Sequence, residues 1–303
     1  MTRRGHRVLA ALLLLVAVAV TATTLEARRD EQHRRANPMQ GALIDIGGRR
    51  LHLQCLGSGH PTVFLLPGAG ETSAVWARIA PTVAKTSRAC MHDRAGRGWS
   101  DPAPAPQDGA ALAADLHALL LRAHIDGPVV LVGHSLGGLY ARIHAARYPA
   151  DVAGMVLLDA THAEMFTRVP IYPAIYWAYR GFTTLLPTLA RLGVLRAPDA
   201  TPALARSQRD EWAAIPVVMH QAAATPTLGD LPLVVVTALR DQMEQWLPLQ
   251  RELVALSSNS VHRVLEHATH MSLLDSAADA AISVKAIVDV IQAVRTGKPL
   301  RGP

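Results

Sequence analysis

The ten residues VVLVGHSLGG, from Val129 to Gly138, constrain the fold more than any other stretch of the chain. An apolar run typical of a buried strand ends abruptly, and Ser135 follows between Gly133 and Gly137. A strand that turns this sharply into a helix strains the backbone at the serine, and bulky side chains two residues away would collide with it. The pattern predicts a serine hydroxyl exposed above a parallel sheet, with the N–H of Leu136 and a helix N-terminus directed at any ligand there.

Other interpretations of the glycine-rich stretches are weaker. An ordinary strand–helix turn with an incidental serine remains an alternative. The stretch lacks the G-x-G-x-x-G spacing of a dinucleotide site, and PGAGET, residues 67–72, lacks the Gly-Lys pair of a phosphate loop.

Strand and helix patterns alternate along residues 41–160 and again along 231–303. This alternation predicts a single α/β core, a parallel sheet with helices on both faces. Residues 161–230 lack clear strand patterns and hold seven of the thirteen aromatic residues of the chain. Because a structureless loop of this length is uncommon inside a compact domain, we expect a helical cap over the carboxyl ends of the strands.

The N-terminus carries most of the net charge of +6 and a candidate targeting segment. Residues 1–35 contain seven arginines and three acidic residues, which leaves 23 basic and 21 acidic residues elsewhere. No basic stripe is interleaved with aromatic residues, so nucleic-acid binding is not expected. The uncharged run Val8–Leu25 would form a helix about 27 Å long, close to the thickness of a bilayer core.

Residues 1–25 are therefore expected to be a signal peptide, cleaved near Ala19 or Ala22, or an uncleaved signal-anchor helix. The anchor is favoured because no single cleavage site stands out. Residues 26–40 are charged and contain Pro38, which is typical of a linker. Both versions place the core outside the cytoplasm, membrane-anchored or secreted, with the membrane as a partner of the N-terminal segment.

A serine nucleophile needs a base, and the base needs an acid that orients it. His270 lies just beyond the last predicted strand, where catalytic groups gather in open α/β sheets. Asp241 ends the preceding strand, LVVVTALR, and gives the chain order Ser, Asp, His. Asp159, which ends the strand MVLLDA, is the competing acid. We favour Asp241 because its separation from His270 matches one strand–helix–strand unit.

Two further histidines flank the same predicted strand. His262 and His267 occupy strand-edge positions that point away from the carboxyl-end crevice, so we interpret them as surface or core residues. A zinc site formed by these two and His270 is disfavoured because the spacing matches no known ligand pattern. We expect neither a metal nor a cofactor.

The second donor for an oxyanion is expected in the glycine loop after TVFLL. There the sequence PGAG offers the N–H of Ala69, between Gly68 and Gly70. Glycines on both sides let the backbone approach a ligand closely. An ordinary tight turn is the alternative.

From about Asp45 to Val294 the chain resembles serine hydrolases of the α/β-hydrolase fold, esterase- or lipase-like. The resemblance rests on LLPGAG, HDRAGRGWSD, GHSLGG, PLVVVTALRD and ATHM. It implies a mostly parallel eight-stranded sheet with helices on both faces and a helical cap inserted after the sixth strand. It assigns Ser135, Asp241 and His270 as the triad and Ala69 and Leu136 as the oxyanion donors. Where many relatives have a histidine, this chain has Pro67, which removes a side chain that orders the oxyanion loop.

The two cysteines, Cys55 and Cys90, would be small apolar residues in a reducing compartment and are candidates for pairing in an exported protein. In the resembled fold their strands are antiparallel neighbours. A disulfide is expected only if their Cα atoms lie within about 7 Å of each other.

These observations predict a serine hydrolase that cleaves carboxylic esters, with apolar acyl groups, through an acyl-enzyme. The partner would be a small-molecule ester or a lipid-like substrate. Thioester cleavage and acyl transfer would use the same triad. A non-catalytic ligand- or partner-binding module on a hydrolase fold is the rival from another class.

Overall fold

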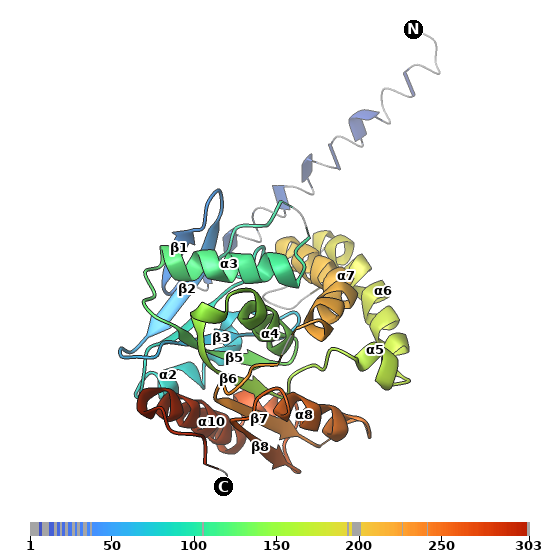
Figure 1. Cartoon of the computed structure of the whole chain (residues 1–303). Coiled ribbons are helices and arrows are strands. Elements are labelled where there is room, and N and C mark those ends of the chain that lie inside the picture. The colour runs from blue at the N-terminus through green and yellow to red at the C-terminus, as the bar shows by residue number, and fades with distance from the viewer. Residues whose placement is uncertain are drawn as a thin grey trace.

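A computed structural model describes residues 38–104, 106–192, 194–195, 201–225, 227–240 and 242–301, together with scattered helical residues between 6 and 36. Its centre is one eight-stranded sheet with helices on both faces (Figure 1). The strands are β1 Ala42–Asp45, β2 Arg50–Leu56, β3 Val63–Leu66, β4 Ala89–His92, β5 Val129–His134, β6 Val152–Leu158, β7 Leu233–Ala238 and β8 Ser260–Leu265.

The strand order is β1-β2-β4-β3-β5-β6-β7-β8. The pairs β1/β2 and β2/β4 are antiparallel, and the other five are parallel. Strands β3, β4, β5 and β7 are buried throughout, as expected for near-continuous apolar runs covered on both faces. The predicted mostly parallel eight-stranded sheet is confirmed.

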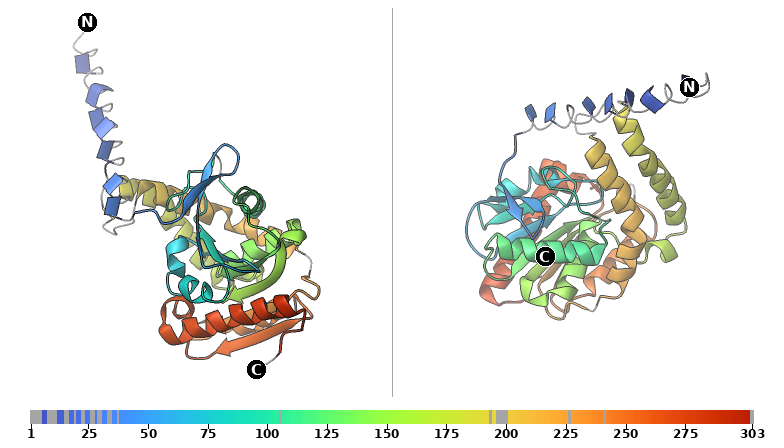
Figure 2. Two further views of the ribbon diagram at one scale, coloured as in Figure 1. Left: turned by 90° about the vertical axis from the view of Figure 1, so that its left-hand side faces the viewer. Right: turned by 90° about the horizontal axis from the view of Figure 1, so that it is seen from above.

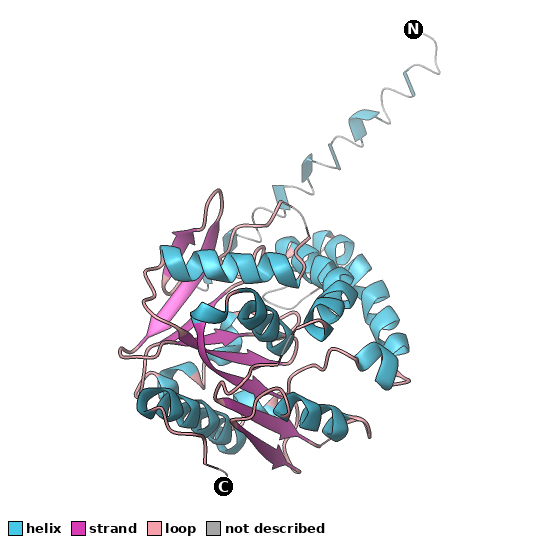
Figure 3. Ribbon diagram, viewed as in Figure 1, coloured by secondary structure: helices cyan, strands magenta, loops and turns pink. Residues whose placement is uncertain are grey.

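Helices cover both faces of this sheet, as Figures 2 and 3 show. One face packs against α2 Ala80–Val83, α9 Ser272–Asp275 and α10 Ala277–Thr296. The other packs against α3 Gly109–Arg122, α4 Gly137–Arg147 and α8 Trp246–Val254. There are also two short 3-10 turns, η1 Ser73–Trp76, which buries Trp76 in the core, and η2 Pro149–Asp151.

The segment between β6 and β7 forms three helices, α5 Met165–Arg168, α6 Tyr172–Arg191 and α7 Pro202–Ala223. Helix α7 packs against α3 and α4 of the core, and α6 packs along α7. The predicted helical insertion after the sixth strand is therefore present. In Figure 1, α6 lies at the outer edge of the molecule, with α7 between it and the core.

The N-terminal segment lies partly outside the described residues. Nine of the eighteen residues of the run Val8–Leu25 and seven of the fifteen residues of the linker 26–40 lie outside them. Within the part of the chain that the structure describes, no helix combines the length and apolarity needed to span a bilayer.

The two cysteines face each other across β2 and β4. Cys55 and Cys90 are direct partners in the antiparallel register. Their Cα atoms lie 4.1 Å apart, and their sulfur atoms form a disulfide. The structure thus joins the two residues that the sequence left as candidates for pairing.

Candidate active site

The serine singled out by the sequence lies in the turn between β5 and α4. Ser135 has φ of 52°, in the left-handed region that non-glycine residues rarely adopt. Its N–H donates to the Leu158 carbonyl at 3.1 Å, and its own carbonyl accepts from the Thr161 N–H at 3.0 Å. These bonds to the end of β6 hold the strained turn in place.

The flanking glycines are required by close backbone packing. A Cβ atom on Gly133 would lie 2.6 Å from the Gly137 carbonyl oxygen, and one on Gly137 would lie 2.2 Å from the Leu66 carbonyl oxygen. Both distances are far below van der Waals contact. The sharp strand–helix turn predicted from the sequence therefore excludes any side chain at these two positions.

His270 lies beside this turn, in the loop between β8 and α9. Its ring centroid is 4.4 Å from that of His134, the residue before the serine. Its Nδ1 is 2.6 Å from the Asp159 carboxylate. This contact engages Nδ1 of His270 and does not involve Nε2.

Asp159 is fully buried at the end of β6. Its carboxylate also accepts the Ala238 N–H at 3.1 Å, the Gln242 side-chain amide at 3.0 Å and the Trp246 indole N–H at 2.7 Å. A buried carboxylate needs such donors because water cannot solvate it. Its φ of 43° places it in a second strained turn, one strand away from the first.

The structure places the competing acid, Asp159, against His270. The role of the favoured acid, Asp241, stays a prediction. Asp241 itself lies outside the described residues. The ranking used sequence separation alone, and separation does not reveal that the turn after β6 directs its carboxylate toward the histidine loop.

The predicted oxyanion loop follows β3 and contacts the serine. A Cβ atom on Gly68 would lie 3.0 Å from the Ser135 Cβ. The N–H groups of Gly68 and Gly70 are occupied by the Glu71 carboxylate at 2.5 Å and the Glu211 carboxylate at 2.8 Å. Among the described residues, no acceptor contacts the N–H of Ala69 between them. This N–H is thus available to a ligand.

Leu136 lies at the N-cap of α4, directly after the serine. Its N–H has no acceptor among the described residues either. A helix N-terminus leaves its first N–H groups unpaired and favours negative charge. The two predicted donors, Ala69 and Leu136, therefore both carry unused N–H groups next to Ser135.

A buried ionic cluster contacts the oxyanion loop, residues 67–70 after β3. Arg94 donates to the Pro67 carbonyl at 2.8 Å and to the Gly68 carbonyl at 2.6 Å. Arg94 and Arg97 also pair with the two oxygens of Glu211, at 2.7 and 2.8 Å. Glu211 belongs to α7, so a helix of the cap contributes directly to the conformation of this loop. The cluster orders a loop in which Pro67 offers no side chain for the purpose.

The charges in the cluster compensate one another. Burial alone would raise the pKa of Glu211, but the charges of Arg94 and Arg97 outweigh it and hold this pKa below its ordinary value. The Tyr140 hydroxyl adds a fourth donor at 3.2 Å. Glu211 is therefore an ionised carboxylate inside the protein, fully paired.

A second contact chain joins the oxyanion loop to His270. The carboxylate of Glu71, which accepts from Gly68, also lies 3.3 Å from Nδ1 of His134. Nε2 of His134 lies 3.3 Å from the His270 carbonyl oxygen. Burial would raise the pKa of Glu71, but the hydrogen bond and charge of His134 lower it overall. His134 is thus a bridge between the oxyanion loop and the histidine loop.

Sequence reasoning missed Arg94, Arg97, Glu211, Glu71 and His134. A signal existed for the arginines, because HDRAGRGWSD was among the segments that carried the resemblance. No local pattern around Glu211 distinguishes it from a solvated helix residue.

The other two histidines of the last strand region have structural contacts. His262 Nε2 lies 2.8 Å from the Thr237 hydroxyl, and His267 Nε2 lies 3.0 Å from the Asp279 carboxylate. Neither forms a metal cluster with His270. Among the described residues, the one cluster with ligand spacing is His162, Glu164 and Glu252.

An arginine already occupies that cluster. The Arg168 guanidinium lies 2.6 Å from Glu252 and 3.2 Å from Glu164. Nδ1 of His162 accepts the Glu164 N–H at 3.2 Å. Because a fixed cation neutralises the carboxylates, the arrangement does not call for a metal ion.

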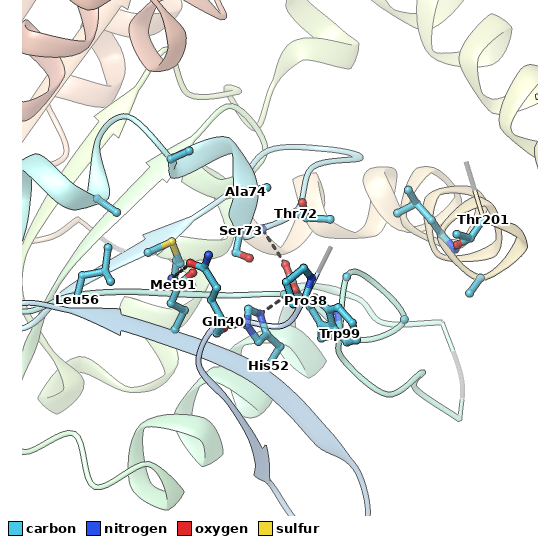
Figure 4. Close-up of a pocket in the computed structure, with 18 of the residues that line it drawn as sticks. Pro38, Gln40, His52, Leu56, Thr72, Ser73, Ala74, Met91, Trp99 and Thr201 are labelled. Atoms are coloured by element: carbon cyan, nitrogen blue, oxygen red, sulfur yellow. Dashed lines mark hydrogen bonds and ion pairs between the residues drawn. The ribbon is translucent and has the colours of Figure 1, made fainter. Parts of the chain in front are cut away.

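One cavity is lined by residues 72–74, which follow the oxyanion loop, and by residues of β2 and β4 (Figure 4). It measures about 550 Å³ and is lined by residues that include Gln40, His52, Ser73, Trp99 and Thr201. A second cavity of about 300 Å³ lies between the Arg94–Arg97 loop and α7. Among the described residues, Ser135 and His270 line neither cavity.

The larger cavity contains a histidine–carboxylate pair that is not a second catalytic centre. Nδ1 of His52 lies 2.8 Å from Asp93, and Nε2 lies 2.6 Å from the Gln40 carbonyl oxygen. Both ring nitrogens are engaged, so neither is free to accept a proton from Ser73. The Ser73 N–H donates to Asp93 at 2.7 Å, which fixes the chain after the oxyanion loop.

A family model described as the alpha/beta hydrolase fold matches residues 61–195, which include the oxyanion loop, the turn that carries Ser135 and the end of β6. The protein has the α/β-hydrolase fold. The resemblance identified from the motifs is thereby confirmed, as is the fold class that it implied.

Relatives of this α/β-hydrolase-fold chain include named hydrolases. A pimeloyl-[acyl-carrier protein] methyl ester esterase of Chromobacterium violaceum is 34% identical over 164 residues, which make up 51% of this chain and 61% of that protein. Lipase LipV of Mycobacterium tuberculosis is 39% identical over 123 residues, 39% of this chain and 45% of that one. The chain spans less than two thirds of the length of the curated relatives it matches.

Solved structures agree on the fold. The Acinetobacter baumannii protein lip1 superimposes with a TM-score of 0.67 at 17% identity and covers 91% of this chain and 97% of that one. At this level of identity the likeness concerns the fold alone.

Proposed function

We propose that this protein is a carboxylic-ester hydrolase with Ser135 as nucleophile, His270 as general base and acid, and Asp159 as the orienting acid. The observation that carries the proposal is the bond from His270 to the buried Asp159, beside a strained serine and two unused N–H groups. Family relatives named as an ester esterase and a lipase support the same reaction class.

In the first half of the reaction, the Ser135 hydroxyl oxygen attacks the acyl carbon and its proton passes to Nε2 of His270. The carbonyl π electrons move to oxygen, and the N–H groups of Ala69 and Leu136 stabilise the resulting oxyanion. When the tetrahedral intermediate collapses, the ester C–O bond breaks and the leaving alkoxide takes the proton from His270. The products of this half are a free alcohol and an acyl ester on Ser135.

In the second half, His270 takes a proton from a water molecule as that water attacks the acyl ester. The same two N–H groups stabilise the second oxyanion. Its collapse returns the proton to the Ser135 oxygen and releases the carboxylic acid. Asp159 fixes the tautomer of His270 and stabilises the imidazolium that forms twice in each cycle.

The substrate class follows from the apolar surroundings of the two N–H donors. Ala69 and Leu136 belong to one hydrophobic cluster with Tyr176 and Ile215 of the cap and Trp246 of the core. An acyl chain placed there would be covered by aromatic and aliphatic side chains. We therefore propose that the acyl group is apolar and that the substrate is a small or lipid-like ester.

We also propose that residues 1–25 direct the chain to or across a membrane. The uncharged run Val8–Leu25 follows three arginines and is too apolar to be solvated as a surface helix. An uncleaved anchor remains our preferred version. N-terminal sequencing of the mature protein and protease shaving of intact cells test it, and a full-length chain found soluble in the cytoplasm would contradict it.

The experiment is a series of p-nitrophenyl esters, from acetate to decanoate, with the purified full-length chain. We expect kcat/KM to rise with acyl length until the apolar cluster is filled. A fluorophosphonate probe should label the wild type and not Ser135→Ala, because only an activated serine reacts. Labelling without ester turnover would favour acyl transfer or thioester cleavage, and failure of both assays would favour a non-catalytic binding module.

A further inference from the structure

The outer face of α6 exposes an apolar surface to solvent. Phe182 and Leu185 are 53% and 58% exposed, and Leu192, one residue past the helix end, is 70% exposed. Ile171 continues the stripe at the other end of the helix. Successive members of this set are eleven, three and seven positions apart, and all three spacings are close to whole numbers of helical turns, which places them on one face of the helix. Figures 1 and 2 show that this helix is the outermost element of the cap.

The opposite face of α6 is equally apolar and already buried. Tyr176, Leu186 and Ala190 pack toward α7. A helix that is apolar on opposite faces is normally covered on both sides. A contiguous exposed apolar surface on a folded protein marks a site of interaction.

The charge around this surface has one sign. From Met165 to Leu195 the sequence contains three arginines and no lysine, aspartate or glutamate. Arg168 pairs with Glu164 and Glu252 at the start of the segment. Arg180 donates to the neutral Thr184 at 2.7 Å, so its charge is not cancelled by that contact. Apolar side chains on one face, with the exposed Trp177 on a flank and arginines farther round the helix, are the pattern of a helix that lies in a membrane interface.

The N-terminal segment leaves the folded core beside this helix. Pro38 and Gln40 line the same cavity as Thr201 and Leu204, at the start of α7. Ala205, the next residue of α7, packs against Leu186 and Ala190 of α6. Residues 1–37 therefore start from the end of the cap at which the C-terminal half of α6 lies.

We propose that the outer face of α6, defined by Ile171, Phe182, Leu185 and Leu192, binds the surface of an acidic phospholipid bilayer. The proposal rests on the proposed membrane direction of residues 1–25, which would bring this end of the cap to the bilayer. The apolar side chains enter the interface, and the arginines contact anionic headgroups. The ester substrate would then reach the cap from the lipid phase.

The chain offers a clean way to test this. Both cysteines form a disulfide, so Leu185→Cys introduces a single free thiol for an environment-sensitive fluorophore. Leu121→Cys is the matched control, because Leu121 is 63% exposed but lies on a different helix, near the end of α3. The start of α3 contacts α7. Both positions are solvent-exposed, so neither substitution removes core packing.

The full-length labelled chains are mixed with vesicles of phosphatidylcholine, with and without phosphatidylglycerol. We expect a blue shift and a several-fold rise in emission at position 185 with acidic vesicles, a weaker change with neutral ones, and no change at position 121. Brominated lipid should quench the probe at position 185. Adding Arg180→Glu should reduce the response, and so should high salt.

Three results would overturn the proposal. They are a probe at position 185 that stays in water, equal responses at positions 185 and 121, and a probe already shielded without lipid. The last would mean that a second copy or the N-terminal segment covers α6. Hydrolysis of a short soluble ester, measured on the same samples, reports separately on the proposed activity.

Discussion

The two long helices of the cap invert the usual relation between burial and polarity. Helix α7 lies inside and buries a charged residue, Glu211, against two arginines. Helix α6 lies outside and exposes large apolar residues, Phe182 and Leu185. A helix that only covered the core would show the opposite distribution.

This difference indicates that the two helices of the cap have different roles. The buried charge of Glu211 is explained by contacts within this chain. Glu211 accepts the Gly70 N–H and pairs with Arg94, which donates to two carbonyl groups of the oxyanion loop. The outer apolar face has no such explanation within the described residues. Helix α7 therefore supports the candidate active site, whereas the outer face of α6 indicates an interaction with a surface outside this chain.

The largest expected effect lies at the site that the inner helix supports. Ser135→Ala removes the attacking oxygen and should lower kcat for p-nitrophenyl esters by about 10⁶-fold. Thermal unfolding should be nearly unchanged, since a single hydroxyl is lost. Near-normal turnover in this variant would end the serine-hydrolase interpretation.

The next effect distinguishes the two acids. Asp159→Asn keeps the shape of the side chain but favours the wrong tautomer of His270, so kcat should fall by about 10⁴-fold. Asp241→Asn is the matched control and should stay close to wild type. A severe defect in the control together with a mild one in Asp159→Asn would restore the acid that the sequence favoured.

A smaller effect tests the inner helix itself. Glu211→Gln leaves Arg94 and Arg97 without their shared counter-charge and should lower the free energy of unfolding by about 3 kcal/mol. The oxyanion loop should loosen, with a loss in kcat below the roughly 10²-fold seen when a direct donor is removed. The neighbouring Asp210→Asn is the control and should change little, because Asp210 pairs with the part-exposed Arg209.

The same variant has a defined pH dependence. Because the folded-state pKa of Glu211 lies below its ordinary 4.5, its ionisation stabilises the protein above that value, and this contribution is lost as the pH falls through the folded-state pKa. Denaturant unfolding from pH 7 to pH 3 should therefore show the gap between wild type and Glu211→Gln narrowing at the acid end. A constant gap would mean that the Glu211 charge does not hold the cluster.

The smallest effect belongs to the outer helix. The double variant Phe182→Ser and Leu185→Ser should change the free energy of unfolding by less than about 0.5 kcal/mol per site, because both side chains are exposed. Hydrolysis of p-nitrophenyl acetate should also be unchanged, as in the control Leu121→Ser. A large loss of stability would show that this face is part of the cap core.

Much of this molecule could be predicted from local sequence. Period and turn chemistry predicted the sheet, and steric exclusion at Gly133 and Gly137 located Ser135. Local sequence could not show the contact between Asp159 and His270, because Asp159 and Asp241 both follow buried strands and the contact depends on the three-dimensional geometry of the turn after β6. Glu211 was invisible for a related reason, since its partners lie more than 100 residues away in the chain.

The most direct test of the central claim is the mass of the enzyme during its first turnover. The full-length chain is mixed with p-nitrophenyl butyrate, quenched in acid and digested. The account predicts one butyryl group on the peptide that contains Ser135, a slower loss of that group in Asp159→Asn, and no adduct in Ser135→Ala. Ester turnover with no adduct, or an adduct on another residue, would contradict it.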